Sequence, residues 1–196
     1  MKKILFVLVL LASVNAFAGI DYGVDAGTTR IGVFGGMAHP QEWDFGGAIG
    51  DEDPGDTAPM FGVEFIRHVS PLMAVGFEFN YAEYGYNNIG AGMESKSTVF
   101  GGHVTGRVTF MSDKSTRVYI PFGLGLSRFE QKINPGWEKS QTGISMFGGA
   151  GVEFDMSPVW TVGVEGRYFY MPLDDDDFAE DFFGATSILF KVSARF

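Results

Sequence analysis

His68 and Ser70 are separated by one residue, and this spacing raises the question of serine nucleophile chemistry. A catalytic serine needs a histidine that takes its hydroxyl proton and an acid that orients the imidazole. The pair ends an alternating segment, residues 60–69, and Pro71 follows it directly, so it is expected at a short turn. A lipid-modifying enzyme would also need access to the outer leaflet, and a short turn is expected at the opposite, periplasmic end. A turn is therefore the simpler interpretation, and we predict no catalytic residues.

Two acidic segments could bind a divalent cation through carboxylate oxygens. One contains Asp51, Glu52, Asp53 and Asp56, and the other is the run 174–177. Neither matches the ligand spacing of an EF-hand loop. Solvated charge on surface loops is the competing interpretation. The chain also lacks cysteine, a Cys/His cluster and a glycine-rich phosphate loop, so we expect no metal site and no cofactor.

Charged residues also occur inside segments that otherwise alternate between apolar and polar residues. This alternation has a period of two, which indicates β-strands. We predict eight of them, at residues 28–37, 60–69, 73–84, 98–110, 117–129, 142–154, 160–170 and 184–196. One face of these strands carries large aliphatic and aromatic residues. The other face combines glycine with charge, and its predicted network comprises Arg30, Glu64, Glu78, Arg107, Glu153, Glu165, Arg167 and Lys191.

The connections between the predicted strands alternate in length. Short turns fall at Ser70-Pro71, at 112–115 and at Ser157-Pro158, and longer polar segments, including 85–96 and 131–141, separate the other strands. Two hairpins share one design, because Gly-Val-Glu-Phe precedes a Ser-Pro turn at 62–65 and again at 151–154. This layout favours an all-β, eight-stranded antiparallel up-and-down transmembrane barrel with short periplasmic turns and longer extracellular loops.

The composition of the two faces distinguishes a barrel from a β-sandwich. A sandwich buries its apolar faces and gives its polar faces to water, so it would not need glycine on the polar side. A narrow barrel in lipid reverses this arrangement, and glycine then leaves room for long charged side chains in the lumen. The inward set has nearly equal numbers of basic and acidic residues, as an enclosed network requires, because an unpaired buried charge is costly.

The ends of the chain support export. A basic start, Lys2-Lys3, precedes an apolar run and the small residues Ala16 and Ala18, which predicts a signal peptide at 1–18 and a barrel domain at 19–196. The apolar run is shorter than the roughly 20 residues of a membrane-spanning helix. The net charge of −10 argues against a nucleic-acid partner. The chain ends on an alternating strand with a terminal aromatic residue, Phe196.

These features together resemble the small eight-stranded outer-membrane proteins of the OmpA/OmpX type, and the resemblance covers residues 19–196. It implies a monomer in the bacterial outer membrane, in contact with lipids and lipopolysaccharide, whose Phe196 is read by the barrel assembly machinery. It also implies a structural or surface-interaction role and no enzyme activity. Two alternatives stay open: a narrow channel or small-ligand conduit like OmpW, and, less favoured, a lipid-modifying enzyme that uses His68 and Ser70.

Overall fold

The computed structural model describes residues 26–41, 57–87, 94–112, 116–134, 137–173 and 182–196. Eight strands account for nearly all of them, as the alternation predicts. They are β1 (Thr29–Pro40), β2 (Ala58–His68), β3 (Met73–Asn87), β4 (Glu94–Ser112), β5 (Thr116–Asn134), β6 (Trp137–Asp155), β7 (Trp160–Pro172) and β8 (Phe182–Arg195). Within these ranges no helix has the length and apolar character needed to cross a membrane.

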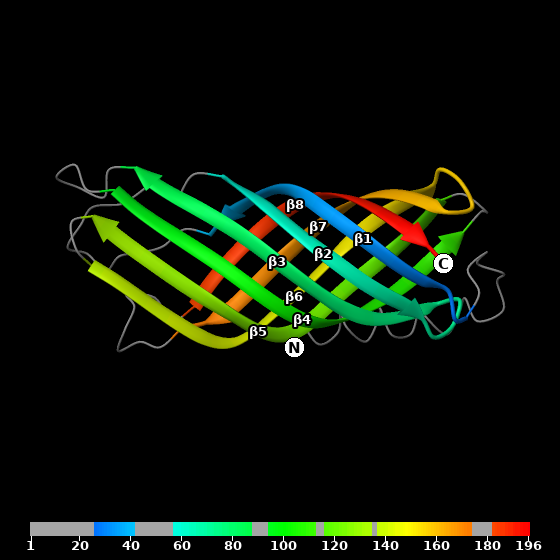
Figure 1. The fold of residues 1–196 in the computed structure, drawn as a ribbon, viewed down its shortest axis with the longest axis horizontal. Coiled ribbons are helices and arrows are strands. Elements are labelled where there is room, and N and C mark those ends of the chain that lie inside the picture. Colours follow the sequence, from blue (N-terminus) through cyan, green and yellow to red (C-terminus); the bar gives the residue numbers. More distant parts are fainter. Residues whose placement is uncertain (1–25, 42–56, 88–93, 113–115, 135–136, 174–181) are drawn as a thin grey trace, which may run out of the picture.

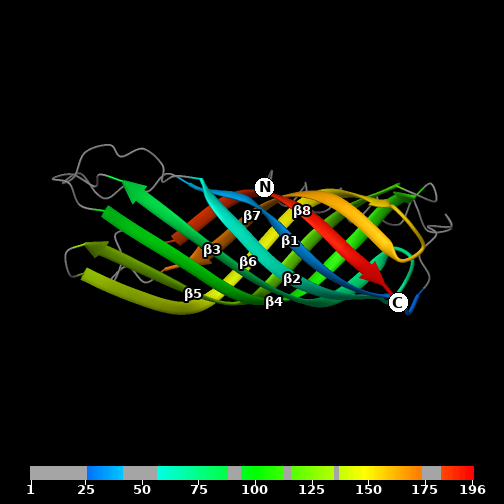
Figure 2. The same cartoon turned by 45° about the horizontal axis from the view of Figure 1, so that its top comes forward.

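The strands form one closed antiparallel barrel (Figures 1 and 2). Each strand pairs with its neighbour in sequence, and β1 pairs with β8 through a register that places Val33 opposite Val192. Closure removes both sheet edges, so every strand has partners on two sides. The predicted eight-stranded up-and-down barrel is confirmed.

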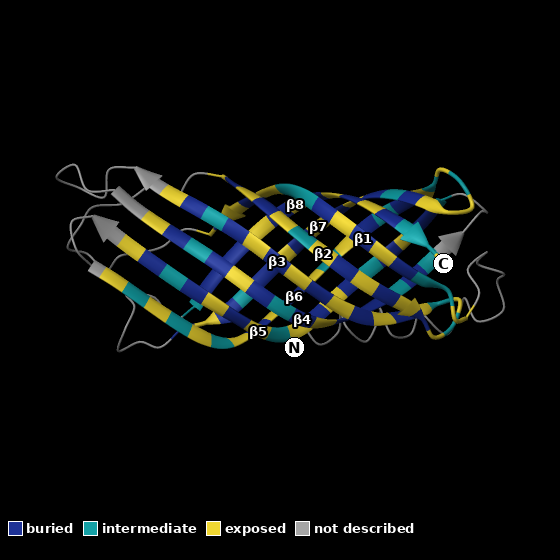
Figure 3. Cartoon of the chain, viewed as in Figure 1, coloured by how far each residue is buried: buried dark blue, intermediate teal, exposed yellow. Residues whose placement is uncertain are grey.

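The period of two separates the chain into an outward and an inward face, and Figure 3 shows the resulting bands along each strand. Adjacent residues Phe77 and Glu78 illustrate the separation, because they are 56% and 2% exposed. Leu124 also points outward, at 58% exposure, while Arg167 is 4% exposed. Apolar residues therefore lie on the outer surface of the barrel, and charged residues face the lumen.

Ser70 and Ser157 organise the two related short hairpins. The Ser70 hydroxyl accepts a hydrogen bond from the backbone N–H of Met73 at 3.0 Å, and the Ser157 hydroxyl accepts one from Trp160 at 3.0 Å. In each turn the residue before the serine, Val69 or Met156, donates its N–H to the carbonyl of the returning strand. The shared Ser-Pro sequence thus encodes the same turn twice.

The predicted polar loops 85–96 and 131–141 are wrong over much of their length. Strand β3 continues to Asn87, β4 begins at Glu94, and β5 and β6 run to Asn134 and from Trp137. β4, β5 and β6 each have 19 residues, although roughly 9–11 residues suffice to cross a bilayer. The apolar alternation stops where a strand leaves hydrocarbon, but backbone pairing continues, so hydropathy underestimates the strand length.

The extra length forms a projection that we call the outer ledge: residues 83–87, 94–98, 128–134 and 137–142. It extends beyond the ends of β1, β2, β7 and β8 at the side opposite the short turns, on the left of Figure 1. The ledge thus carries regular structure outward from the membrane.

Candidate functional site in the lumen and on the outer ledge

All eight residues predicted to line the lumen are buried inside the barrel. Strand alternation alone puts their side chains on the inward face, and barrel closure brings residues from distant strands within contact distance. The structure groups them into two ionic clusters that share Glu64.

Glu153 is the centre of the first cluster. One of its oxygens accepts hydrogen bonds from Arg30 at 2.7 Å and from the Nε of Arg117 at 2.6 Å. The other oxygen accepts one from Arg107 at 2.8 Å. Three guanidinium groups from β1, β4 and β5 therefore converge on one carboxylate of β6, which links four strands across the lumen.

Arg167 and Lys191 hold the second cluster together. The Arg167 guanidinium contacts both oxygens of Glu78, one of them at 3.0 Å, and its Nε donates to Glu165 at 2.8 Å. Lys191 bridges Glu165 at 2.9 Å and Glu64 at 2.7 Å. A longer contact of 3.3 Å between Arg107 and Glu64 joins the two clusters. Every strand of the barrel contributes at least one member.

Sequence reasoning missed Arg117, Asp155 and Tyr119. Asp155 accepts hydrogen bonds from Arg117 at 2.8 Å, from Arg195 at 2.6 Å and from Thr161 at 3.0 Å. The Tyr119 hydroxyl donates to Glu165 at 3.0 Å, and the Arg107 guanidinium lies 4.1 Å from the centre of its ring. The alternation could have found Arg117 and Tyr119, because they are two residues apart and therefore lie on the same face of their strand. Asp155 could not be found in this way, because it lies just past the predicted end of its strand.

Glycine makes room for this ring at one well-defined place. A Cβ atom on Gly151 would lie 2.4 Å from the Tyr119 ring, far inside van der Waals contact. Gly151 is the register partner of Tyr119 on β6, so the missing side chain lets the phenol reach across to Glu165.

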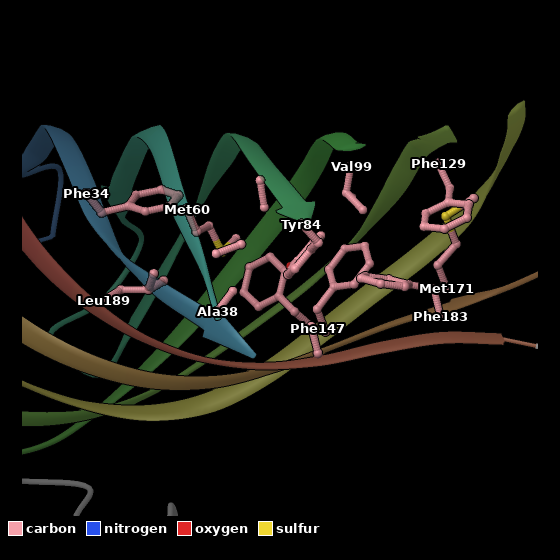
Figure 4. Close-up of a cluster of buried hydrophobic side chains, with 14 of the residues drawn as sticks. Phe34, Ala38, Met60, Tyr84, Val99, Phe129, Phe147, Met171, Phe183 and Leu189 are labelled. Carbon is pink, nitrogen blue, oxygen red and sulfur yellow. The ribbon is translucent and has the colours of Figure 1, made fainter. Parts of the chain in front are cut away.

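The outer half of the lumen is dominated by apolar side chains, which the charge-based prediction did not include. Figure 4 shows this aromatic cluster, in which Phe129 and Phe183 have ring centres 5.1 Å apart and Tyr84 packs edge-on against Phe183 at 5.4 Å. Phe147 lies at its boundary with the ionic layer, 4.0 Å from the Arg167 guanidinium. The inward aromatic residues were visible in the alternation but carried no charge to mark them.

The ionic layer is closely packed. A gap of about 10 Å³, enclosed by Glu64, Arg107, Tyr119 and Lys191 among others, lies within the ionic layer. Such a volume accommodates about one water molecule. The ionic and aromatic layers thus fill much of the described part of the lumen.

The His68 and Ser70 side chains form no catalytic pair. His68 points into the barrel at 1% exposure and neither of its ring nitrogens has a hydrogen-bond partner, whereas the Ser70 hydroxyl is used in the turn. The two acidic segments, 51–56 and 174–177, lie outside the described residues. Within the described ranges, no group of three or more histidine, aspartate or glutamate side chains is arranged to hold a metal ion.

The ledge carries paired charges on its outward face. Lys96 contacts Glu83 at 2.8 Å, and Lys132 contacts Glu130 at 2.8 Å and Glu138 at 3.2 Å. The hydrogen bond from Lys96 lowers the pKa of Glu83 below its ordinary value. These side chains are exposed or half-exposed, so each pair adds little stability. They instead make the ledge a hydrated polar surface above the last apolar row, which includes Tyr81 and Phe100.

The outward face below the ledge is a continuous apolar belt. Trp160 and Phe196 lie exposed near its short-turn end, where aromatic residues are typical of a membrane interface. A hollow of about 1000 Å³ opens on this face and is lined almost wholly by apolar atoms, with Gly106 and Gly148 beside Phe122. Such a surface is stable against hydrocarbon and would be an aggregation liability in water.

The closed barrel, its apolar belt and its ionic lumen define a transmembrane β-barrel protein of the bacterial outer membrane. The chain belongs to the family described as "Outer membrane protein beta-barrel domain", which it matches over residues 4–196. It therefore resides in the outer membrane, in contact with the lipids of that bilayer.

Solved structures show the same fold at low sequence identity. Neisserial surface protein A is 14% identical, with a TM-score of 0.61 and coverage of 87% of this chain and 99% of that chain. Ail of Yersinia pestis, in complex with the heparin analogue sucrose octasulfate, is 15% identical, with a TM-score of 0.56 and the same coverage. OprG of Pseudomonas aeruginosa is 10% identical, with a TM-score of 0.55 and coverage of 90% and 99%. No curated protein sequence is significantly similar to this chain.

Proposed function

We propose that this protein is a monomeric, non-catalytic outer-membrane barrel with a surface-interaction role, in which the outer ledge presents the binding surface. The observation that carries the proposal is the uneven length of the strands, because β4, β5 and β6 continue well past the bilayer while their neighbours end. A barrel that only fills membrane area needs no such extension. The ledge offers paired backbone that continues outward beyond the last apolar row.

The filled lumen supports the same role. An ionic layer toward the periplasm and an aromatic layer toward the outside leave little space for solute passage in the described part. The Glu/Arg network has a structural role in this proposal, because its ion pairs link all eight strands. Lipopolysaccharide is the expected neighbour of the ledge, because Lys96, Arg128 and Lys132 lie just above the apolar belt, at the depth of lipid phosphate groups.

Export and assembly complete the proposal. Residues 1–18 act as a cleaved signal peptide, and Phe196 acts as the signal for the barrel assembly machinery. The backbone N–H of Phe196 donates to Thr29 at 2.9 Å, while its side chain is 74% exposed. The terminal strand is therefore paired while its last ring stays accessible.

Shortening the ledge tests the surface role. Replacing residues 130–140 by Asn-Gly, which favours a tight hairpin, should leave the barrel folded because the change lies beyond the apolar belt. We expect cells that produce this variant to lose adhesion to immobilised glycans and matrix proteins, relative to cells that produce the full protein. The heat-modifiable gel shift of both proteins is the control for folding. Equal adhesion with an intact fold would contradict the proposed role of the ledge.

A second candidate, a conduit for small amphipathic molecules, rests on the aromatic cluster. Above Phe129, the inward residues Ser97 and Gln131 are opposite one another in the register, and each is buried with a polar atom that lacks a partner. An amphipathic ligand could place an apolar body on the rings and a polar group against this pair. Phe129→Ser should then slow uptake of such a probe into liposomes containing the barrel. Uptake equal to that of protein-free liposomes would remove this candidate.

A further inference from the structure

We propose that the periplasmic half of the lumen binds a small monovalent anion such as chloride, on the wall formed by β8, β1 and β2. The site is built from Arg30, Arg195 and His68, with Thr109 of β4 at its edge. Nothing in the proposed surface role depends on it.

Unpaired donors are the first observation. Arg30 gives one nitrogen, Nη1, to Glu153, while its Nε and Nη2 have no partner, and the Nε of Arg195 also has none. Both ring nitrogens of His68 and the hydroxyl of Thr109 are without partners as well. Arg30 and Thr109 are fully buried and His68 is 1% exposed. Buried N–H groups are costly unless an acceptor satisfies them.

The register places these donors next to one another. Arg30 and Arg195 are direct partners on β1 and β8. The backbone N–H of His68 donates to Thr28, two residues before Arg30, so His68 is the diagonal neighbour of Arg30 on the same inward face. Between His68 and Arg107 the row contains only Ala74, so no long side chain stands between the imidazole and the guanidinium in that row. The unpaired groups thus form one arc of the barrel wall.

Charge distinguishes an anion from a water molecule as the occupant. Six basic side chains and five carboxylates meet in the described lumen: Arg30, Arg107, Arg117, Arg167, Lys191 and Arg195 against Glu64, Glu78, Glu153, Asp155 and Glu165. Four of the six basic side chains lie at the periplasmic end: Arg30, Arg107, Arg117 and Arg195. Their carboxylate partners there are Glu153 and Asp155, because Glu64 is shared with Lys191. Like charges that face each other across a strand pair repel, and Arg30 faces Arg195. One anion between them would offset this repulsion and accept the unpaired hydrogen bonds.

The surroundings limit the size and the route of the ligand. Arg30, His68 and Thr109 are enclosed, which excludes sulfate or phosphate with its hydration shell, while the Arg195 side chain is 19% exposed and borders the periplasmic opening. A halide that enters from the periplasm past Arg195 fits both limits.

Thermal unfolding of the detergent-folded protein, in sodium chloride or sodium gluconate at equal ionic strength, tests the proposal. Gluconate is too large for the site. We expect chloride to raise the unfolding midpoint by about 3 to 5 °C for each tenfold rise in concentration above the dissociation constant. Arg30→Lys keeps the charge but removes Nε and Nη2, so the chloride effect should be lost. Arg128→Lys, on the ledge, is the matched control and should keep it.

Bromide in crystals of the wild-type protein gives a test that does not depend on any variant. An anomalous peak between Arg30 and Arg195 would support the site. Equal midpoints in chloride and gluconate, an undiminished chloride effect in Arg30→Lys, or a bromide-soaked crystal without a peak there would each overturn it.

Discussion

Replacing Glu153 with glutamine should destabilise the barrel more than any other single conservative change in the lumen, by about 3 to 5 kcal/mol. The amide fills the same volume, so the loss isolates charge from packing. Arg30, which is fully buried, would then lose the carboxylate that it contacts, while Arg107 would keep Glu64 and Arg117 would keep Asp155. Burying one guanidinium group without a counter-charge, and weakening the charge balance around two others, is far costlier than losing one neutral hydrogen bond.

Urea unfolding in lipid vesicles, followed by the heat-modifiable gel shift, measures this loss. Glu138→Gln on the ledge is the matched control, because that glutamate pairs with Lys132 in an exposed position, and it should leave the midpoint unchanged. Adding Arg30→Gln to Glu153→Gln should recover part of the lost stability, since it removes the guanidinium that lost its carboxylate. A Glu153→Gln midpoint equal to that of the wild type would show that the cluster does not hold the strands together.

Arg167→Met should lower the free energy of unfolding by a similar amount, about 3 to 5 kcal/mol, but through a change of the opposite charge. It leaves carboxylates rather than guanidiniums without a partner. Glu165 keeps Lys191 at 2.9 Å, so most of the cost falls on Glu78, whose two oxygens accept hydrogen bonds from Arg167. Methionine retains an unbranched apolar chain beside Phe147, which limits the loss of packing.

A double-mutant cycle separates the ion pair from other effects of this change. Glu78→Gln with Arg167→Met should be more stable than Arg167→Met alone, because the stranded negative charge is gone. Arg128→Met on the exposed ledge should shift the unfolding midpoint little. If the double variant were as unstable as the sum of the two single variants, Glu78 and Arg167 would not be coupled, and the proposed role of the network would be wrong.

The alternation in the sequence predicted the orientation of side chains within the membrane-spanning part of each strand. The alternation placed Phe77 outward and Glu78 inward, and the same parity predicted the inward position of Arg167 and Lys191. The alternation did not predict the outer ends of β4, β5 and β6. There the exposed face also carries polar residues, such as Lys96 and Lys132, so it has no apolar pattern. Outside hydrocarbon a strand has no reason to keep an apolar face, so its pattern looks like that of a loop.

The amino-acid sequence by itself determined the number of strands, the face on which each side chain lies, and the class of environment on each face. These are local properties, because a period of two depends only on neighbouring residues and on the solvent around one strand. The tertiary structure alone decided that Glu153 takes three arginines, that Arg167 bridges Glu78 and Glu165, and that an aromatic layer fills the outer lumen. Those contacts cross the barrel, so they depend on strand stagger and closure, which no single segment encodes.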